Sequence, residues 1–221
     1  MLRWLFYLLL PLQFACAPLE RPAEVAPCTS YLSQQQLLAG NWLQQAAVWQ
    51  LRQSALLEFG AKKIPLEGLL QLDTAQRKAR LIAMNEMGLV MFDLELDEQG
   101  QQLHRALPQL QQQPGFAIGV ATSLRQIFFQ PSPQSSDHQQ QRQTSQRLWR
   151  LLPGGSLGFN YSCDGELQET RQVADAGNWR VRYRDYQSFA GQRIPQQIVF
   201  NDYQHRVKLS LWLREVKRDH E

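Results

Sequence analysis

Residues 62–96 read KKIPLEGLLQLDTAQRKARLIAMNEMGLVMFDLEL, and apolar side chains recur at every second position through most of this stretch. In residues 64–72 the apolar side chains occupy the even positions, and a polar turn at 73–76 separates this run from residues 79–83, which alternate again. A third alternating run follows Gly88 at residues 89–96. Short runs of period two joined by short polar turns are typical of an antiparallel meander. The stretch therefore predicts consecutive β-hairpins.

The same pattern continues on both sides of this stretch. Residues 47–59 predict an earlier strand, and a turn at 97–100 leads to a short strand at 102–106. From Arg147 onward strands are predicted at 148–151, 157–163, 166–173, 179–186, 194–201 and 206–214, with a loop at 187–193 and turns at 164–165 and 202–205. This makes about ten strands in all, a mainly β (α+β) chain.

Three segments depart from the strand pattern. Residues 29–40 predict a helix with Thr29 or Ser30 as its N-cap. Residues 108–129 predict an apolar helical segment that begins near Pro114. Residues 130–146 are rich in Pro, Ser and Gln, and we interpret them as a mobile surface loop that contributes nothing to a core.

The first seventeen residues have the pattern of an export signal. Arg3 precedes an apolar run at residues 4–12, and small residues close the segment at 13–17. Such a run is too short to span a bilayer. Residues 12–16 resemble the lipobox of bacterial lipoproteins, which implies lipid attachment at Cys16. Residues 15–17 also match an ordinary signal peptidase site, so simple secretion and an uncleaved anchor remain alternatives.

Composition limits the possibilities for the chain beyond the signal. Residues 18–28 contain three prolines and predict a tether, and residues 29–221 are long enough for a single domain. A hydrophobic fraction of 43% is too high for an intrinsically disordered chain. A formal net charge of only +3 provides no strong positive field that would attract nucleic acid. The spacing of Cys and His residues predicts no metal site, and no cofactor is expected.

Two cysteines remain if Cys16 carries lipid. In an oxidising compartment, Cys28 and Cys163 would form a disulfide that ties the tether to a later strand. Two unrelated thiols are the equally weighted alternative, because the sequence gives no distance between them.

The end of the chain resembles a known bacterial family. Tyr183-Arg184-Asp185-Tyr186 is followed by residues 194–201, which read IPQQIVFN, and then by the alternating residues 207–211. This pattern, with the export signal and the apolar insertion, resembles the lipoprotein-carrier superfamily typified by LolA and LolB, and bacterial outer-membrane lipoproteins such as those encoded with aryl-polyene pathways. The resemblance implies a curved antiparallel open half-barrel with one or two helices covering its concave face. It carries no catalytic residues.

The implied concave face can hold an acyl chain. Our candidates for lining it are inward-capable apolar residues of the strands and the insertion, namely Leu70, Leu72, Leu81, Phe92, Phe116, Ile127, Phe128, Phe200, Leu211 and Leu213. Arg180, Arg182 and Arg184 alternate along one strand, where a solvated outer face is the main interpretation and contact with anionic lipid headgroups is the second.

Other motifs have simpler explanations than catalysis. Residues 154–158 match G-x-S-x-G around Ser156, but a strand and turn follow where a nucleophile elbow needs a helix. His104, His138, His205 and His220 are scattered without metal-ligand spacing, and Asp93, Glu95 and Asp97 fit a solvated strand face.

The sequence thus predicts a non-enzymatic lipoprotein at the periplasmic face of the outer membrane. Its expected partners are a lipid or acylated ligand, the membrane through its anchor, and a periplasmic protein. The alternative is a scaffold lipoprotein that acts through a protein partner and has no open cavity. A third hypothesis, an esterase using Ser156, predicts hydrolysis that Ser156→Ala abolishes.

Overall fold

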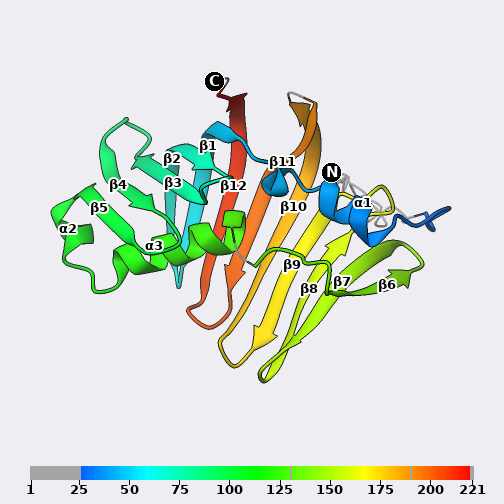
Figure 1. Ribbon diagram of the computed structural model, residues 1–221. Helices are drawn as coiled ribbons and strands as arrows, with labels where there is room; N and C mark the ends of the chain where they lie inside the picture. The colour runs from blue at the N-terminus through cyan, green and yellow to red at the C-terminus, as the bar shows by residue number, and fades with distance from the viewer. Residues whose placement is uncertain (1–25, 130, 190, 220–221) are drawn as a thin grey trace, which may run out of the picture.

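The structure is a computed structural model that describes residues 26–129, 131–189 and 191–219 (Figure 1). Its framework is one antiparallel sheet of twelve strands in the order β5-β4-β3-β2-β1-β12-β11-β10-β9-β8-β7-β6. The strands are β1 (Val48–Phe59), β2 (Lys62–Asp73), β3 (Lys78–Met84), β4 (Val90–Leu96), β5 (Gln101–Ala106), β6 (His138–Arg142), β7 (Ser145–Leu152), β8 (Gly155–Tyr161), β9 (Leu167–Ala174), β10 (Gly177–Phe189), β11 (Gln192–Asp202) and β12 (Val207–Arg218).

This sheet consists of two meanders that meet at one strand pair. Strands β1–β5 form the N-terminal meander and β6–β12 form the C-terminal meander, and β12 pairs with β1 over most of its length. The sheet curves strongly and stays open, with β5 and β6 at its two edges (Figure 1). The predicted open half-barrel is confirmed.

Short helices interrupt or precede the meanders. They are α1 (Gln34–Ala39), the 3₁₀ turn η1 (Trp42–Gln44), α2 (Pro108–Gln111), α3 (Phe116–Leu124) and the π-helical turn η2 (Arg125–Phe129). The chain from α2 to η2 connects the two meanders and runs across the concave face of the sheet (Figure 1). None of the helices in the described ranges has the length and apolarity needed to cross a membrane.

Side-chain alternation in β2 follows the predicted phase. Leu70 and Leu72 are 2% and 0% exposed on the concave side, whereas Leu69 between them is 44% exposed on the convex side. Burial of each such side chain stabilises the fold by about 1.5–3 kcal/mol. The core therefore lies on the concave side, beneath the helices.

The prediction of a loop over residues 130–146 was wrong for its second half. Residues 138–142 form the edge strand β6, which pairs with β7 from His138↔Trp149 to Arg142↔Ser145. All five residues of β6 are exposed, so the strand carries no alternating apolar pattern from which it could have been recognised. Backbone pairing alone defines it.

Two other predicted boundaries also change. The first helix begins later than expected, because Ser33 and Gln36 form a capping box, and the hydroxyl of Ser33 accepts the backbone N–H of Gln36. The expected loop at 187–193 is mostly strand, since β10 continues to Phe189 and β11 starts at Gln192.

Candidate functional site

Helix α3 covers the N-terminal meander with apolar side chains. The sequence has no charged residue from Ala106 to Leu124. Ala121 and Leu124 are buried, and the ring of Phe116 meets the ring of Phe92 edge to face at 5.2 Å. Ile118 on the opposite side of the helix is 59% exposed. The cover is therefore held to the sheet beneath it by non-directional apolar contacts.

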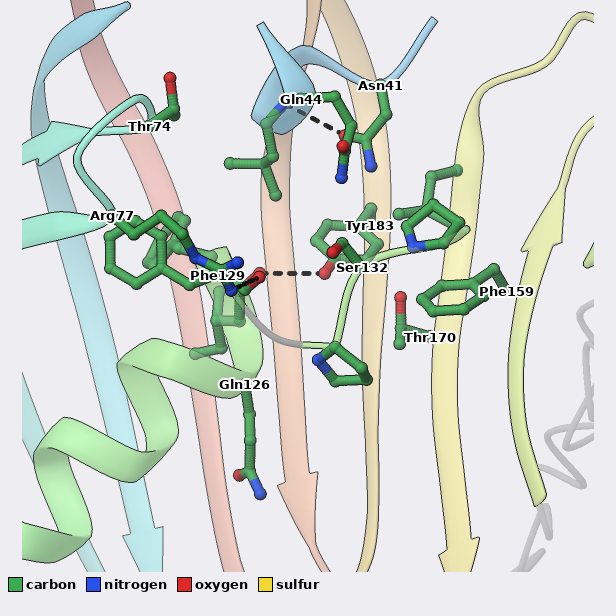
Figure 2. A pocket seen from close by; sticks show the side chains of 16 residues that line it. Asn41, Gln44, Thr74, Arg77, Gln126, Phe129, Ser132, Phe159, Thr170 and Tyr183 are labelled. Carbon is green, nitrogen blue, oxygen red and sulfur yellow. Dashed lines mark hydrogen bonds between the residues drawn. The ribbon is translucent and has the colours of Figure 1, made fainter. Parts of the chain in front are cut away.

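Hydrogen bonds fix the C-terminal end of this cover. The guanidinium of Arg125 donates to the carbonyl of Asp97 at 2.8 and 3.0 Å. The Tyr183 hydroxyl donates to the carbonyl of Ile127 at 3.0 Å, and Arg77 Nη2 donates to the carbonyl of Phe129 at 2.9 Å (Figure 2). Carbonyls in the last turn of a helix have no partner within the helix, and Tyr183 and Arg77 supply donors to two of them.

An irregular segment, residues 131–137, covers the C-terminal meander, and we call it the strap. Arg150 of β7 donates to the carbonyl of Ser132, and its Nε lies 3.3 Å from Oδ1 of the buried Asp137. The Gln34 amide donates to the carbonyls of Gln134, Ser135 and Asp137 at 3.0–3.1 Å. Directional polar contacts therefore hold the strap.

A cavity of about 210 Å³ lies where η2, the strap and η1 meet β9 and β10. Ile127, Phe128 and Phe159 form apolar parts of its wall, and Thr170 and Tyr183 contribute polar groups (Figure 2). Sites for drug-sized ligands occupy about 300–1,000 Å³. An acyl chain therefore needs the cover to move before it can enter.

The ten candidate lining residues all belong to, or pack against, one buried core on the covered side of the sheet. Ile127 and Phe128 line the cavity, Phe116 lies on α3, and the seven sheet residues are less than 9% exposed. They are brought together, but they pack against the cover rather than around open space. Their contact with a ligand stays a prediction. The polar wall residues Thr170 and Tyr183 were missed because we considered only apolar positions.

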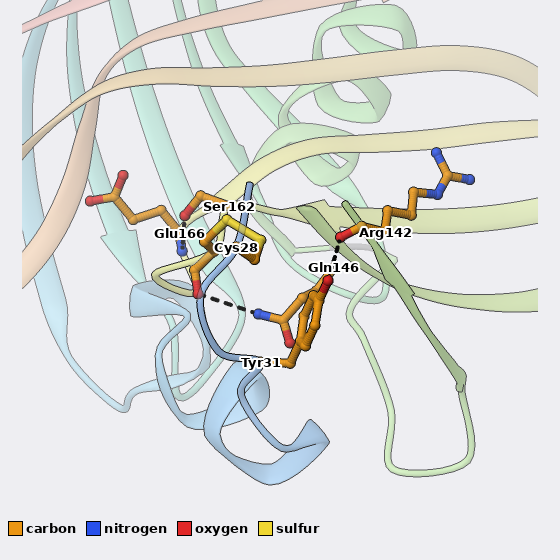
Figure 3. Close-up of a disulfide and its surroundings, with 7 residues drawn as sticks. Cys28, Tyr31, Arg142, Gln146, Ser162 and Glu166 are labelled. Atoms are coloured by element: carbon orange, nitrogen blue, oxygen red, sulfur yellow. Dashed lines mark hydrogen bonds between the residues drawn. A yellow bond between two sulfur atoms is a disulfide. The ribbon is translucent and has the colours of Figure 1, made fainter. Parts of the chain in front are cut away.

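A disulfide joins Cys28 to Cys163, with Cα atoms 5.3 Å apart (Figure 3). The segment that follows Cys28 lies along the edge of the sheet, where Cys28 N–H donates to the carbonyl of Gln143 and the Tyr31 hydroxyl to the carbonyl of Arg142. The disulfide therefore anchors the chain that leads to Gln34 and the strap. Cys16, the predicted lipid attachment, and His220 lie outside the described residues.

The predicted arginine row lies on the convex face of β10. Arg180 and Arg182 approach the same carboxylate oxygen, Oε2 of Glu169, at 3.9 and 3.3 Å. Arg184 is exposed. Two of the three arginines thus share one internal counter-ion, which the sequence alone did not indicate.

The nucleophile-elbow context is absent around Ser156. Ser156 lies within β8, and the elements described after it are all strands. A side chain at Gly155 would place its Cβ 1.8 Å from the carbonyl oxygen of Val173, so the glycine permits close strand pairing. His205 contacts Asp202 in a turn. Within the described ranges no three potential metal ligands come together.

Comparisons with known proteins identify the fold. No protein-family model matches the chain, and no curated protein matches its sequence. A LolA superfamily protein from Nitrosomonas europaea superimposes with a TM-score of 0.54 and 9% identity, covering 86% of this chain and 95% of that one. A domain named for outer membrane lipoprotein sorting, from Vibrio parahaemolyticus, gives a TM-score of 0.54 and 8% identity over 84% and 90% of the two chains. The chain has a LolA-like fold.

Proposed function

We propose that this protein is a non-enzymatic, exported lipoprotein that binds a lipid or acylated molecule on the concave face of its sheet and passes it on. The uncharged cover α3 on an apolar concave face is the observation that supports this most directly. Transfer of each CH₂ of an acyl chain from water to that face contributes about 0.8 kcal/mol. An acyl chain that replaces α3 restores the apolar contacts that the sheet loses when the helix moves away.

The arrangement of polar contacts supports an exchangeable cover. Beneath α3 the contacts are apolar, whereas hydrogen bonds from Arg125, Arg77 and Tyr183 concentrate on its C-terminal end and on η2. The helix can therefore swing away from Phe92 while η2 stays attached. Such a movement opens the face over β4 and β5 without unfolding the sheet.

Location in the bacterial envelope is part of the proposal. The N-terminal export pattern supports it, and so does the disulfide, because disulfides persist in oxidising compartments. The likeness to the lipoprotein-sorting domain supports the periplasmic face of the outer membrane. Attachment through Cys16 is the corresponding proposal for the anchor.

A packed interior favours a second candidate, the scaffold lipoprotein. The cavity volume is only about 210 Å³. Exposed apolar side chains lie at Met87 and Leu89, which are 87% and 48% exposed. A scaffold would use such side chains on a protein partner and would keep α3 in place.

A titration separates the two candidates. Delipidated full-length protein is mixed with a fluorescent fatty acid, and saturable binding is expected. Phe116→Ala removes the ring that packs on Phe92 beneath α3 and should accelerate association, whereas Ile118→Ala, at an exposed position of the same helix, should not. Ser156→Ala should leave binding unchanged. A flat titration with protein that shows a cooperative unfolding transition would exclude the carrier and favour the scaffold.

A further inference from the structure

Arginines from four strands gather on the convex face of the C-terminal meander. The sheet register places Asn160, Glu169 and Arg182 in one row with Arg147, and Arg171 and Arg180 in the next row with Gly158. Arg142 of β6 lies beside them at the start of the β6–β7 hairpin. We call Arg142, Arg147, Arg171, Arg180 and Arg182 the convex arginine cluster. These residues come from three parts of the sequence, 142–147, 171 and 180–182, and strand pairing brings the three parts together.

The cluster has too few counter-ions. Glu169 is shared by Arg180 and Arg182. Within the described ranges, no carboxylate lies within 4.0 Å of a guanidinium nitrogen of Arg142, Arg147 or Arg171. Glu166, at one end of the neighbouring groove, is bound by Arg193 at 2.6 Å. Asp185 also lines that groove. Among the carboxylates in the described ranges, only Glu169 lies within 4.0 Å of a guanidinium nitrogen of the five arginines.

Arg147 has a buried donor that no acceptor in the described ranges satisfies. Its side chain lies across Gly158, where a Cβ would be 2.6 Å from Nη2 and 2.7 Å from Nε. The Nε atom is buried and has no hydrogen-bond acceptor. Burial lowers the pKa of Arg147, and the neighbouring charges of Arg142 and Arg171 lower it further. A buried donor without a partner costs about 1–3 kcal/mol, and more when it is charged. An external acceptor would remove this cost.

We infer that the convex arginine cluster is a binding site for a phosphate group, centred on Arg147 and flanked by Arg142 and Arg171. A tetrahedral phosphate offers acceptors in several directions, which suits guanidinium groups that approach from different strands, and guanidinium binds phosphate bidentately. A groove of about 550 Å³ adjoins the cluster along Arg142, Arg182 and Arg184 and leaves room for the group that carries the phosphate.

The phosphate can belong to a lipid headgroup or to a soluble phosphate ester. Cys28 N–H donates to the carbonyl of Gln143, next to Arg142, so the N-terminal end of the described chain lies at the same edge of the sheet as the cluster. The site is separate from the concave face, so it does not depend on acyl-chain binding.

The test uses full-length protein and two probes. Arginine Nε–Hε NMR signals are followed while inorganic phosphate replaces chloride at constant ionic strength. In parallel, binding is measured to phosphatidylcholine vesicles with and without phosphatidylglycerol. Arg147→Gln removes the central donor. Gly158→Ala keeps every charge but displaces the Arg147 guanidinium. Arg52→Gln, on the convex face of the N-terminal meander, makes the same charge change as Arg147→Gln and serves as the control.

We expect the Arg147 signal to shift saturably with phosphate, and both cluster variants to weaken phosphate binding about tenfold. Arg52→Gln should change it less than twofold. Losses on phosphatidylglycerol vesicles that parallel those with phosphate identify a headgroup, whereas losses with inorganic phosphate alone identify a soluble ester. Equal losses in Arg52→Gln and Arg147→Gln, or no saturable shift in folded protein, would overturn the site. Urea unfolding of each variant confirms that it is folded.

Discussion

The two meanders share one sheet and one curvature, but their concave faces are covered in opposite ways. Over β4 and β5 the cover is an uncharged helix held by side-chain packing, with Phe116 on Phe92. Over β7–β10 the cover is the strap, held by Arg150 and Gln34 and linked through α1 to a disulfide. Apolar contacts can be exchanged for those of any apolar molecule, whereas a set of directional hydrogen bonds cannot. The N-terminal meander is thus suited to exchange, and the C-terminal meander to a fixed shape.

The convex faces differ in a parallel way. On the N-terminal meander opposite charges are matched across strands, as in the bidentate contact between Arg80 and Asp93. On the C-terminal meander Arg147 and Arg171 have no carboxylate partner among the described residues. The cross-strand pair on the N-terminal meander therefore contrasts with the unpaired Arg147 and Arg171, where we propose an external anion.

The largest expected effect tests whether both covers protect a true core. Leu72→Ala in β2 should lower the free energy of unfolding by about 2–5 kcal/mol, and Phe159→Ala in β8 by about 3–5 kcal/mol, because both side chains are buried. Urea denaturation measures both values, with the exposed Leu69→Ala as control, expected to cost less than about 1 kcal/mol. A cost below that of the control for Phe159→Ala would show that the strap covers no core.

The second-largest effect is expected from removal of the disulfide. Replacing Cys28 and Cys163 together by serine should cost about 2–5 kcal/mol, because the crosslink closes a loop with a sequence separation of 135 residues. Hydrogen exchange should increase in the strap and in residues 28–36, while α3 keeps its exchange rates. Equal acceleration in α3 would mean that the two covers are not independent.

A smaller effect is expected from Gln34→Ala. This change removes three amide contacts to strap carbonyls and should cost about 1–2 kcal/mol. Gln35→Ala is the matched control, since Gln35 is the exposed neighbour on the same helix. Limited proteolysis within residues 131–137 should accelerate for the first variant only. Unchanged cleavage would contradict the role assigned to Gln34.

The smallest expected effect is on the stability of the fold at low pH. The Arg80 guanidinium lowers the pKa of Asp93 in the folded state through a hydrogen bond. A lowered folded-state pKa means that this contribution to stability is present above the unfolded value of about 3.9 and is lost as the pH falls below it. Asp93→Asn should therefore lose less stability than the parent protein between pH 6 and pH 3. Equal losses in urea midpoints would show that the pair contributes nothing.

The strands were predictable where one face of the sheet is buried and the other is exposed to solvent. Leu72, Val207 and Leu209 alternate with polar neighbours, and the resemblance added the half-barrel shape. Strand β6 was not predictable, because its exposed HQQQR sequence has no apolar face. The insertion divides into separate helices at Pro114-Gly115, where Gly115 adopts a φ of 76° that favours glycine. The sequence predicted only that a helical segment begins near Pro114.

The burial of the apolar candidate residues was predictable from the sequence, whereas the polar groups around them were not. Hydrophobicity alone is enough to predict that Phe128 and Leu211 are buried. The donors Tyr183 and Arg77 act through hydrogen bonds to backbone carbonyls that depend on the tertiary fold. Likewise Arg147 and Gly158 carry no local signal, because the register between β7 and β8 places one over the other.

Movement of α3 on ligand binding can be measured directly. Spin labels are attached through engineered keto side chains at the exposed positions Ile118 on α3 and Lys62 in the β1–β2 hairpin, which leaves the cysteines untouched. Pulsed electron paramagnetic resonance then gives the distribution of distances between the two labels before and after saturation with a fatty acid. An exchangeable cover predicts a second, displaced population whose fraction rises with bound fatty acid. A single unchanged distance at full occupancy would contradict it.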